Sequence, residues 1–166
     1  MKNELLIAQI SDMHIVNKFD PHYSNNRRLK NAIDVINNFK PKIDLIIGTG
    51  DLTDNGSNEE YCNLKNILSK AIPNVYLIPG NHDKRENMKK VFSDHFYLQN
   101  KKYFCYTIEN SLVSLIGLDT LEVGKPGGKL CNERIAWLKE KLEKIKKKPV
   151  IIFLHHPPFN CGIWWM

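Results

Sequence analysis

Four short aliphatic runs lie along the chain, and polar residues follow each of them. The runs are bounded by turn residues and consist mainly of Ile, Leu and Val, which is typical of strands buried on both faces. Ligands collect at the carboxyl ends of strands in an open α/β sheet, so the polar residues are expected to meet at one edge of one sheet. The predicted strands are Leu5–Ile10, Ile43–Ile47, Val75–Ile78 and Val150–Leu154.

The segments between the first three runs have apolar residues at helical spacing, so each is predicted to contain a helix. Apolar residues recur on one face of the segment Asn25–Phe39, and Pro41 stops that helix. Ser57 and Glu60 have the spacing of a capping box, which predicts the start of a second helix. The inward residues are predicted to be Leu29, Ile33 and Ile36 in the first helix and Tyr61, Leu64, Leu68 and Ala71 in the second.

The second half of the chain is predicted to contain a short helix, a hairpin and a longer helix. Asp83 and Glu86 have the spacing to cap a short helix that ends near Phe92. Two apolar stretches separated by a turn indicate the hairpin. The hairpin strands are Tyr103–Ile108 and Leu112–Leu118, and the longer helix is Asn132–Lys147 with Ile135, Leu138, Leu142 and Ile145 on one face.

This order of elements predicts an α/β fold in a single domain over residues 1–166. The alternation of strand and helix at the start favours a partly parallel sheet. Hydrophobic residues make up 42% of the chain and charged residues 25%, as in globular proteins. No apolar run approaches the roughly 20 residues that a membrane-spanning helix needs, and no signal peptide is evident. We therefore expect a cytoplasmic protein without membrane contact.

The net charge of +6 raises the question of nucleic-acid binding. Much of this charge lies in the segment Lys139–Lys148, within the predicted last helix. Glu140 with Lys144, and Glu143 with Lys147, have the spacing of ion pairs on one helix. A solvated helix face is the better interpretation, and nucleic acid is not expected as a partner.

The cysteines do not form a recognisable site. Their positions include no CxxC pair, which argues against a zinc ribbon or a thioredoxin-like site. Disulfides are rare in cytoplasmic proteins, so reduced and partly buried thiols are expected. The cysteines are Cys62, Cys105, Cys131 and Cys161.

The polar residues that follow the four runs are the candidate functional residues. Each motif is weak alone, because turn residues explain Asp-x-His or Gly-Asp after a strand. Together, each at a strand end, they are hard to explain as turns. The motifs are Asp12-Met13-His14, Gly50-Asp51, Gly80-Asn81-His82-Asp83 and His155-His156-Pro157-Pro158.

The residue types in these motifs fit a centre of two metal ions. Asp51 has two carboxylate oxygens and could bridge two ions. Asp12 and His14 are two residues apart, so on an extended chain both face one side and could hold one ion. Asn81 and His155 could hold the other. Nitrogen and oxygen ligands without thiolate suit Mn²⁺, Fe or Zn²⁺ better than Ca²⁺ or Mg²⁺.

As a set, these motifs resemble those of the calcineurin-like metallophosphoesterases: D-x-H, G-D, G-N-H-[DE], H-x-P and a final G-H-x-H. Within that superfamily the sequence is most similar to the class III cyclic nucleotide phosphodiesterases. The resemblance runs from about Leu5 to the end of the chain. It implies a layered α-β-β-α sandwich with mixed sheets and two divalent ions, Fe or Mn foremost and Zn as an alternative.

The resemblance also implies a role for each residue. One ion would be held by Asp12, His14 and Asp51, and the other by Asp51, Asn81 and His155. His82 would lie near the scissile phosphate, and Asp83 would orient it. Substrate would be bound by His14, Asp51, Asn81 and His82.

One family motif has no counterpart in this sequence. The G-H-x-H motif should follow His155 by some tens of residues, but the sequence ends at Met166. Each ion would then lack one histidine, and the last strands of the sandwich would be missing. We therefore expect a fold that is incomplete at the C-terminus, with an open sheet edge and an exposed apolar face, unless Trp164 and Trp165 fold back into the core.

Three functions follow from these observations. The first is a metal-dependent phosphodiesterase that cleaves a 3′,5′-cyclic nucleotide such as cAMP or another small phosphodiester. The second is a weakly active or inactive remnant of such an enzyme. The third is a nuclease of the same superfamily, although no aromatic stacking platform is evident. A second subunit could cover an open sheet edge, so a homo-oligomer is a further expectation.

Overall fold

The computed structural model describes residues 4–17, 25–99, 101–145, 148–159 and 162. In chain order the elements are β1 (Ile7–Ile10), α1 (Asn25–Asn38), β2 (Leu45–Thr49), α2 (Asn58–Leu68), β3 (Asn74–Ile78), α3 (Arg85–Val91), the 3₁₀ helix η1 (Phe96–Leu98), β4 (Tyr106–Glu109), β5 (Ser114–Gly117), α4 (Asn132–Lys144) and β6 (Val150–Phe153). Among the described residues, no helix has both the length and the apolar character to cross a membrane.

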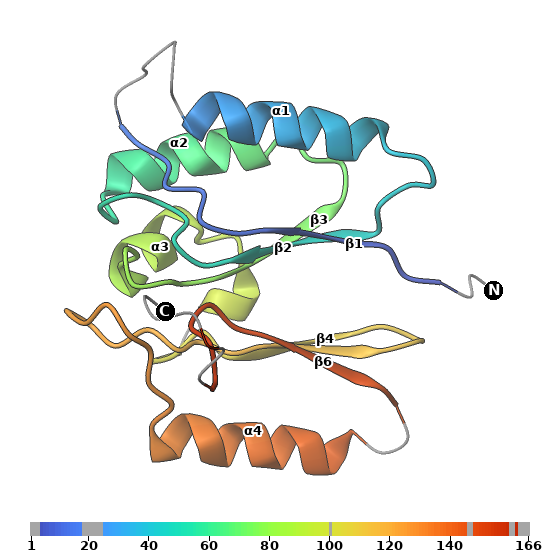
Figure 1. Cartoon of the computed structure of the whole chain (residues 1–166), viewed down its shortest axis with the longest axis vertical. Helices are drawn as coiled ribbons and strands as arrows, with labels where there is room; N and C mark the ends of the chain where they lie inside the picture. Colours follow the sequence, from blue (N-terminus) through green and yellow to red (C-terminus); the bar gives the residue numbers. More distant parts are fainter. Residues whose placement is uncertain (1–3, 18–24, 100, 146–147, 160–161, 163–166) are drawn as a thin grey trace.

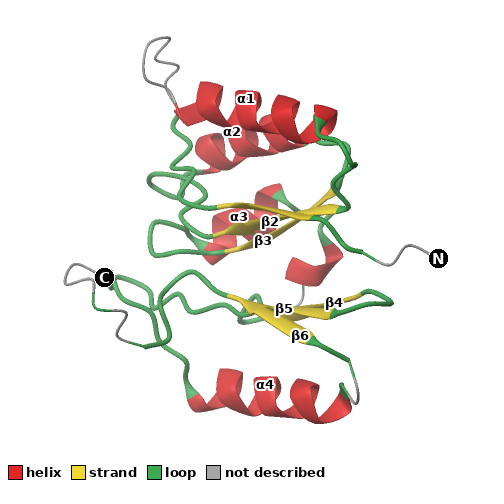
Figure 2. Cartoon of the chain, turned by 45° about the vertical axis from the view of Figure 1, so that its right-hand side comes forward, coloured by secondary structure: helices red, strands yellow, loops and turns green. Residues whose placement is uncertain are grey.

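The strands form two sheets that pack face to face between helices (Figure 1). The first sheet has the order β1-β2-β3 and is parallel throughout. The second has the order β4-β5-β6, with β4 antiparallel and β6 parallel to β5. In both views α1 and α2 cover the first sheet and α4 covers the second (Figure 2). The expected α-β-β-α sandwich is confirmed, including a mixed second sheet.

The expectation that all four aliphatic runs share one sheet is wrong. The first three form the first sheet, whereas the run at 150–154 provides β6 of the second sheet. A short aliphatic run indicates a buried strand, but it carries no information about which neighbour the strand pairs with. The polar residues after β6 therefore reach the site from the opposite layer of the sandwich.

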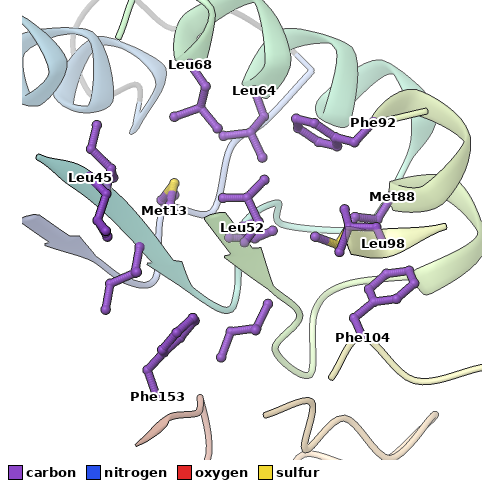
Figure 3. Packing of buried hydrophobic residues seen from close by; sticks show 14 of the residues in the cluster. Met13, Leu45, Leu52, Leu64, Leu68, Met88, Phe92, Leu98, Phe104 and Phe153 are labelled. Atoms are coloured by element: carbon purple, nitrogen blue, oxygen red, sulfur yellow. The ribbon is translucent and has the colours of Figure 1, made fainter. Parts of the chain in front are cut away.

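The first sheet and its helices are tightly packed. Every residue of β2 is buried, and α1 buries Leu29 and Ile33 against the core. The capping box predicted for α2 is present: the Ser57 hydroxyl accepts from the Glu60 amide, and the Glu60 carboxylate accepts from the Ser57 amide. Figure 3 shows Leu64 and Leu68 pointing from α2 into this core.

Aromatic side chains join the two sheets. The rings of Tyr97 and Tyr106 lie 4.3 Å apart between centroids, and Phe153 lies 6.0 Å from Tyr106. The Tyr106 hydroxyl crosses the interface and donates to the Leu77 carbonyl at 2.9 Å. Burial of these rings, together with satisfied hydroxyls, fixes the second sheet against β3.

The outer part of the second layer is more exposed than its pattern predicts. Ile135 and Leu142 on the expected inner face of α4 are 37% and 39% exposed, and Ile151 and Ile152 of β6 are 45% and 38% exposed. Among the described strands β6 lies at the edge of its sheet, so the expected open edge and apolar face are present. The predicted pair of Glu140 with Lys144 forms at 2.6 Å.

Several predicted elements have different boundaries in the structure, and two of them show why. The predicted cap at Asp83 is wrong, because α3 starts after Lys84 and has no side-chain cap. The hairpin strand begins at Tyr106 rather than at Tyr103, and the Phe104 amide donates to the Asp119 carboxylate instead of a strand. The predictions about Lys147, Trp164 and Trp165 lie outside the described residues.

Candidate metal centre and active site

The loops after β1 and β2 run side by side and are joined by their main chains. The amides of Asp12, His14 and Ile15 donate to the carbonyls of Gly50, Asp51 and Leu52 at 3.1, 2.9 and 3.1 Å. These bonds continue the parallel pairing of β1 with β2 beyond the ends of the strands. The Asp-x-His and Gly-Asp motifs are thereby held beside each other on a rigid backbone.

Three of the predicted ligands have left-handed backbone conformations. The φ angles are 54° at Asp12, 41° at His14 and 47° at Asp51. The extended chain expected from Asp12 to His14 is therefore wrong. Such conformations cost non-glycine residues roughly 1–3 kcal/mol each and persist where the surrounding structure enforces them, which is common in active sites.

Asp51 lies at the centre of the site and is only 5% exposed. Its Oδ1 lies 3.4 Å from Nε2 of His155, and its Oδ2 lies 3.6 Å from Nε2 of His14 and 3.9 Å from Nε2 of His82. Potential ligand atoms form two groups of three, each within 4.8 Å, and Asp51 belongs to both. The groups are His14, Asp51 and His82, and Asp12, Asp51 and His155.

The surroundings of Asp51 keep it ionised. Burial alone would raise the pKa of this carboxyl, but hydrogen bonding from His155 and from the backbone of His82 lowers the pKa to about 2. Burial likewise disfavours the charged form of His155, while contacts with Asp51 and with the Thr49 carbonyl raise its pKa overall. A buried carboxylate that stays negative is suited to attract cations.

Main-chain carbonyls set the tautomers of two histidines. Nδ1 of His155 lies 2.8 Å from the Thr49 carbonyl, and Nδ1 of His82 lies 2.7 Å from the Asp54 carbonyl. A carbonyl only accepts, so each Nδ1 carries a proton, and in the neutral imidazole each Nε2, which faces Asp51, has a lone pair free for a metal ion. This is the arrangement that imidazole ligands of metals usually have.

Asp54 is a site residue that the motif search missed. Besides accepting from His82, it places Oδ1 3.4 Å from Nδ1 of His14. It thus contacts both histidines, whose rings lie edge to face at 4.6 Å. The only signal in the sequence is a second carboxylate three residues after Asp51, in the same loop.

Asp83 does not orient the His82 ring, contrary to the expectation. Its carboxylate is buried and accepts from the amides of Gly80 and Leu52 at 2.8 and 3.0 Å and from the Tyr61 hydroxyl at 2.8 Å. Burial raises the pKa of this carboxyl. Asp83 therefore ties the loop after β3 to the loop that carries Asp51, and the Asp54 carbonyl takes the orienting role.

The loop after β3 approaches Asp51 closely. The His82 amide donates to Oδ1 of Asp51 at 3.0 Å. A Cβ at Gly80 would lie 2.3 Å from both the amide nitrogen and Oδ1 of Asp51, so only glycine fits there. Asn81, which follows Gly80 and precedes His82, is half-buried in this loop.

Two other polar residues near the strand ends have structural partners. The His156 ring contacts the Thr120 hydroxyl through Nδ1 at 2.8 Å, consistent with a supporting position rather than a ligand. Asp119 caps its turn by accepting from the Leu121 amide. It also forms a bidentate ion pair with Arg85 at 2.6 and 2.7 Å, which the sequence did not indicate.

The donors present fit divalent metal ions. Asp51 is shared between two groups that contain only carboxylate and imidazole donors, the ligand types that suit Mn²⁺, Fe and Zn²⁺. The grouping differs from the expected one, since Asp12 and His14 fall into different groups. The predicted ligands Asp12, His14, Asp51 and His155 are nevertheless brought together, with His82 among them.

Comparison with known proteins places this arrangement in a family. The model of the calcineurin-like phosphoesterase domain matches residues 5–166. A probable glycerophosphodiester phosphodiesterase of Arcobacter nitrofigilis is 41% identical over 96% of this chain and 59% of its own length. A probable cyclic nucleotide phosphodiesterase of Fibrobacter succinogenes is 34% identical over 97% of this chain and 60% of its own length.

A further relative is the 3′,5′-cyclic adenosine monophosphate phosphodiesterase CpdA of Escherichia coli K12. It is 29% identical over 96% of this chain and 58% of its own length. The chain thus spans about three-fifths of the length of these relatives. Because the family model matches nearly the whole of this chain, the chain belongs to the calcineurin-like phosphoesterase family.

Proposed function

We propose that this protein is a metal-dependent phosphodiesterase that hydrolyses a small phosphodiester, with 3′,5′-cyclic nucleotides such as cAMP as the leading substrate class. The observation that carries the proposal is the position of Asp51, which two groups of potential ligands share. Phosphodiesterase names among the relatives support it. A cytoplasmic location fits such a substrate.

The site residues divide into ligands and a proton donor. Asp12, His14, Asp51, Asn81 and His155 would hold two divalent ions, Mn²⁺ or Fe in the first place and Zn²⁺ as the alternative. Such ions supply Lewis acidity and an activated water for in-line attack on phosphorus. Asp51 directs its two oxygens to different imidazoles and so holds the two donor groups together.

His82 is the residue best placed to act on the leaving group. Its side chain is 41% exposed, while its Nδ1 is fixed by the Asp54 carbonyl. The protonated imidazole can give a proton to the leaving oxygen or balance the charge that develops on it. His14, Asp51 and Asn81 would contact the phosphate together with His82.

A glycerophosphodiester is the second substrate class. The relative from Arcobacter nitrofigilis, which is 41% identical to this chain, carries that name. Both classes present the same phosphodiester to the metal centre and differ only in the groups attached to it. Selectivity between them therefore depends on the surroundings of the centre rather than on the ligands.

The test is hydrolysis of bis(4-nitrophenyl) phosphate by the 166-residue chain with Mn²⁺, compared with its Asp51→Asn variant. Loss of the carboxylate shared by both groups should lower turnover at least about a hundredfold. The matched control is Asp94→Asn, because Asp94 is an exposed partner of Lys65 outside the site, and this variant should keep full turnover. Cyclic AMP and a glycerophosphodiester are then compared as substrates.

Metal titration accompanies the assay, so that binding and turnover are read separately. Two ions per chain in the wild type and weaker binding in Asp51→Asn support the proposal. Equal turnover in the wild type and Asp51→Asn contradicts it. Absence of both metal binding and turnover in a folded wild-type chain also overturns it, in favour of an inactive remnant.

A further inference from the structure

Two segments of the second layer meet beside the candidate metal centre. One is the pair His155-His156 after β6, and the other is the loop at 118–131, which runs from β5 to α4. In both views this loop lies at the same end of the sandwich as the loops that follow β1, β2 and β3 (Figures 1 and 2). No step of the proposed hydrolysis uses the loop at 118–131.

A side-chain hydrogen bond joins the two segments. Nδ1 of His156 lies 2.8 Å from the hydroxyl of Thr120, which is only 3% exposed. His156 directly follows His155, whose Nε2 lies 3.4 Å from Oδ1 of Asp51. The two imidazole rings meet edge to face at 4.8 Å. The loop is therefore tied to the neighbour of a predicted metal ligand.

The base of the loop is closed over this hydrogen bond. The Lys129 amide donates to the Thr120 carbonyl at 2.8 Å, and Leu121 pairs with Gly128 in an antiparallel bridge. A Cβ at Gly128 would lie 2.5 Å from Cγ of the His156 ring. Only glycine allows such a close approach, so the loop rests directly on the imidazole.

The turn at 121–123 of this loop forms one wall of an open pocket of about 640 Å³. Another wall is the segment 83–87, which begins directly after His82. An organic group on a phosphate bound beside His82 can extend into this space. The volume is typical of pockets that bind small molecules.

The charges in the lining favour an uncharged group over a second phosphate. Arg85 and Arg134 share the carboxylate of Asp119, at 2.6 and 3.6 Å. Lys129 lies 3.8 Å from Glu122. The basic side chains of the lining are thus largely matched by carboxylates, and little charge is left to bind a further anion.

Apolar surface is available in the same pocket. Val123 lines it and is 81% exposed, and the half-buried ring of Tyr103 lies in another wall. A flat ring gains free energy by packing on such surfaces, whereas a glycerol group has no ring to place there. Size, charge and apolar surface together fit a nucleoside better than glycerol.

We propose that Thr120 and His156 are positioning residues that hold the turn at 121–123 as one wall of a subsite for the nucleoside group of the substrate. This inference rests on the proposed function, because the metal centre must hold the phosphate for that group to reach the pocket. Both residues act through the loop. They set the affinity for the nucleoside and leave the affinity for the phosphate unchanged.

The test compares two ligands of equal charge that differ in the organic group, adenosine 5′-monophosphate and methyl phosphate. Calorimetric titration of the 166-residue chain with Mn²⁺ present measures both dissociation constants without turnover. The wild type should bind the nucleotide roughly tenfold more tightly, because its base packs on the pocket wall.

Two adjacent glycines provide a matched pair of variants. Gly128→Ala places a methyl group against the His156 ring and displaces the loop, so the preference for the nucleotide should fall to about twofold while methyl phosphate binds as before. Gly127→Ala is the control. A Cβ at Gly127 meets nothing within 4 Å, and Gly127 does not line the pocket, so the preference should be kept.

Side-chain variants test the hydrogen bond itself. Thr120→Val removes the hydroxyl, and His156→Gln removes the group at the position of Nδ1, so both should lose the preference. Thr120→Ser keeps a hydroxyl and His156→Asn keeps an amide near the position of Nδ1, so both should restore it. Urea denaturation of each variant shows whether it is folded.

Several results would overturn the inference. Equal affinity of the wild type for both ligands removes the subsite, and an unchanged preference in Gly128→Ala and Thr120→Val removes the positioning role. A parallel loss of affinity for both ligands in these variants also contradicts it, since that marks a general structural role.

Hydrolysis of methyl 4-nitrophenyl phosphate separates this inference from the proposed function. Turnover by the wild type without a preference for the nucleotide removes the subsite alone. Absence of turnover together with absence of methyl phosphate and nucleotide binding removes the phosphodiesterase proposal and this inference with it.

Discussion

The two layers of the sandwich contribute very unequally to the site. The first sheet supplies three of the four motif loops, after β1, β2 and β3, whereas the second sheet supplies only His155 after β6. The first sheet is also better covered: β2 is buried throughout, while β6 has two exposed isoleucines. The better-packed layer is the one that holds most of the donors.

This difference shows that the centre depends on how the layers dock. One of the two donor groups includes His155, whose Nδ1 reaches back to Thr49 at the end of β2. The first layer alone could position Asp12, His14, Asp51 and His82, but only the docked second layer completes the other group. Contacts across the interface therefore affect metal binding as well as stability.

The largest expected effect comes from Asp119→Ala. Asp119 is fully buried and compensates the buried Arg134 and the partly buried Arg85, so its removal leaves both cations with one partner fewer. The free energy of unfolding, measured by urea denaturation, should fall by about 3–5 kcal/mol. Glu140→Ala, which breaks an exposed pair with Lys144, is the control and should leave the curve nearly unchanged. A comparable effect of both substitutions would contradict the role of Asp119.

A matched pair of leucines compares the packing of the two layers directly. Leu64 of α2 is fully buried, whereas Leu142 of α4 is 39% exposed. Leu64→Ala should lower the free energy of unfolding by about 2–5 kcal/mol, because it leaves a cavity. Leu142→Ala should cost less than about 1 kcal/mol. If the two values were equal, α4 would be as tightly packed as α2 in solution, and the proposed contrast would fail.

The smallest of these effects is expected from Tyr106→Phe. The substitution keeps the ring but leaves the Leu77 carbonyl without the hydroxyl that crosses the interface. The expected loss is about 1–2 kcal/mol in the free energy of unfolding. Calorimetric titration with Mn²⁺ should also show weaker binding, because His155 depends on the same docking. Unchanged stability with unchanged binding would show that the aromatic packing alone joins the layers.

Much of the fold could be predicted because it rests on local patterns. The aliphatic runs identified β1, β2, β3 and β6, and the spacing of Ser57 and Glu60 identified the start of α2. Such signals depend on neighbours a few residues apart, so they survive without knowledge of the fold. The boundaries were less certain where a side chain from a distant segment takes over a backbone group, as Asp119 does at Phe104.

The site was only partly predictable for the same reason. The motif residues were found because polar residues follow apolar runs, but their partners lie elsewhere in the chain. Asp83 was expected to face His82, yet its donors include Leu52 and Tyr61, which are more than 20 residues away. Asp54 contacts His14 and His82 although no pattern links the three residues.

By itself the sequence determined that carboxylate and imidazole groups end several buried strands, and that helices separate the first three of them. Hydrophobic burial and local spacing are sufficient for that much. Only the tertiary structure decided that β6 joins a second sheet and that Asp51 lies between two donor groups. These features depend on which distant surfaces pack together, and that choice is made by the whole core rather than by any one segment.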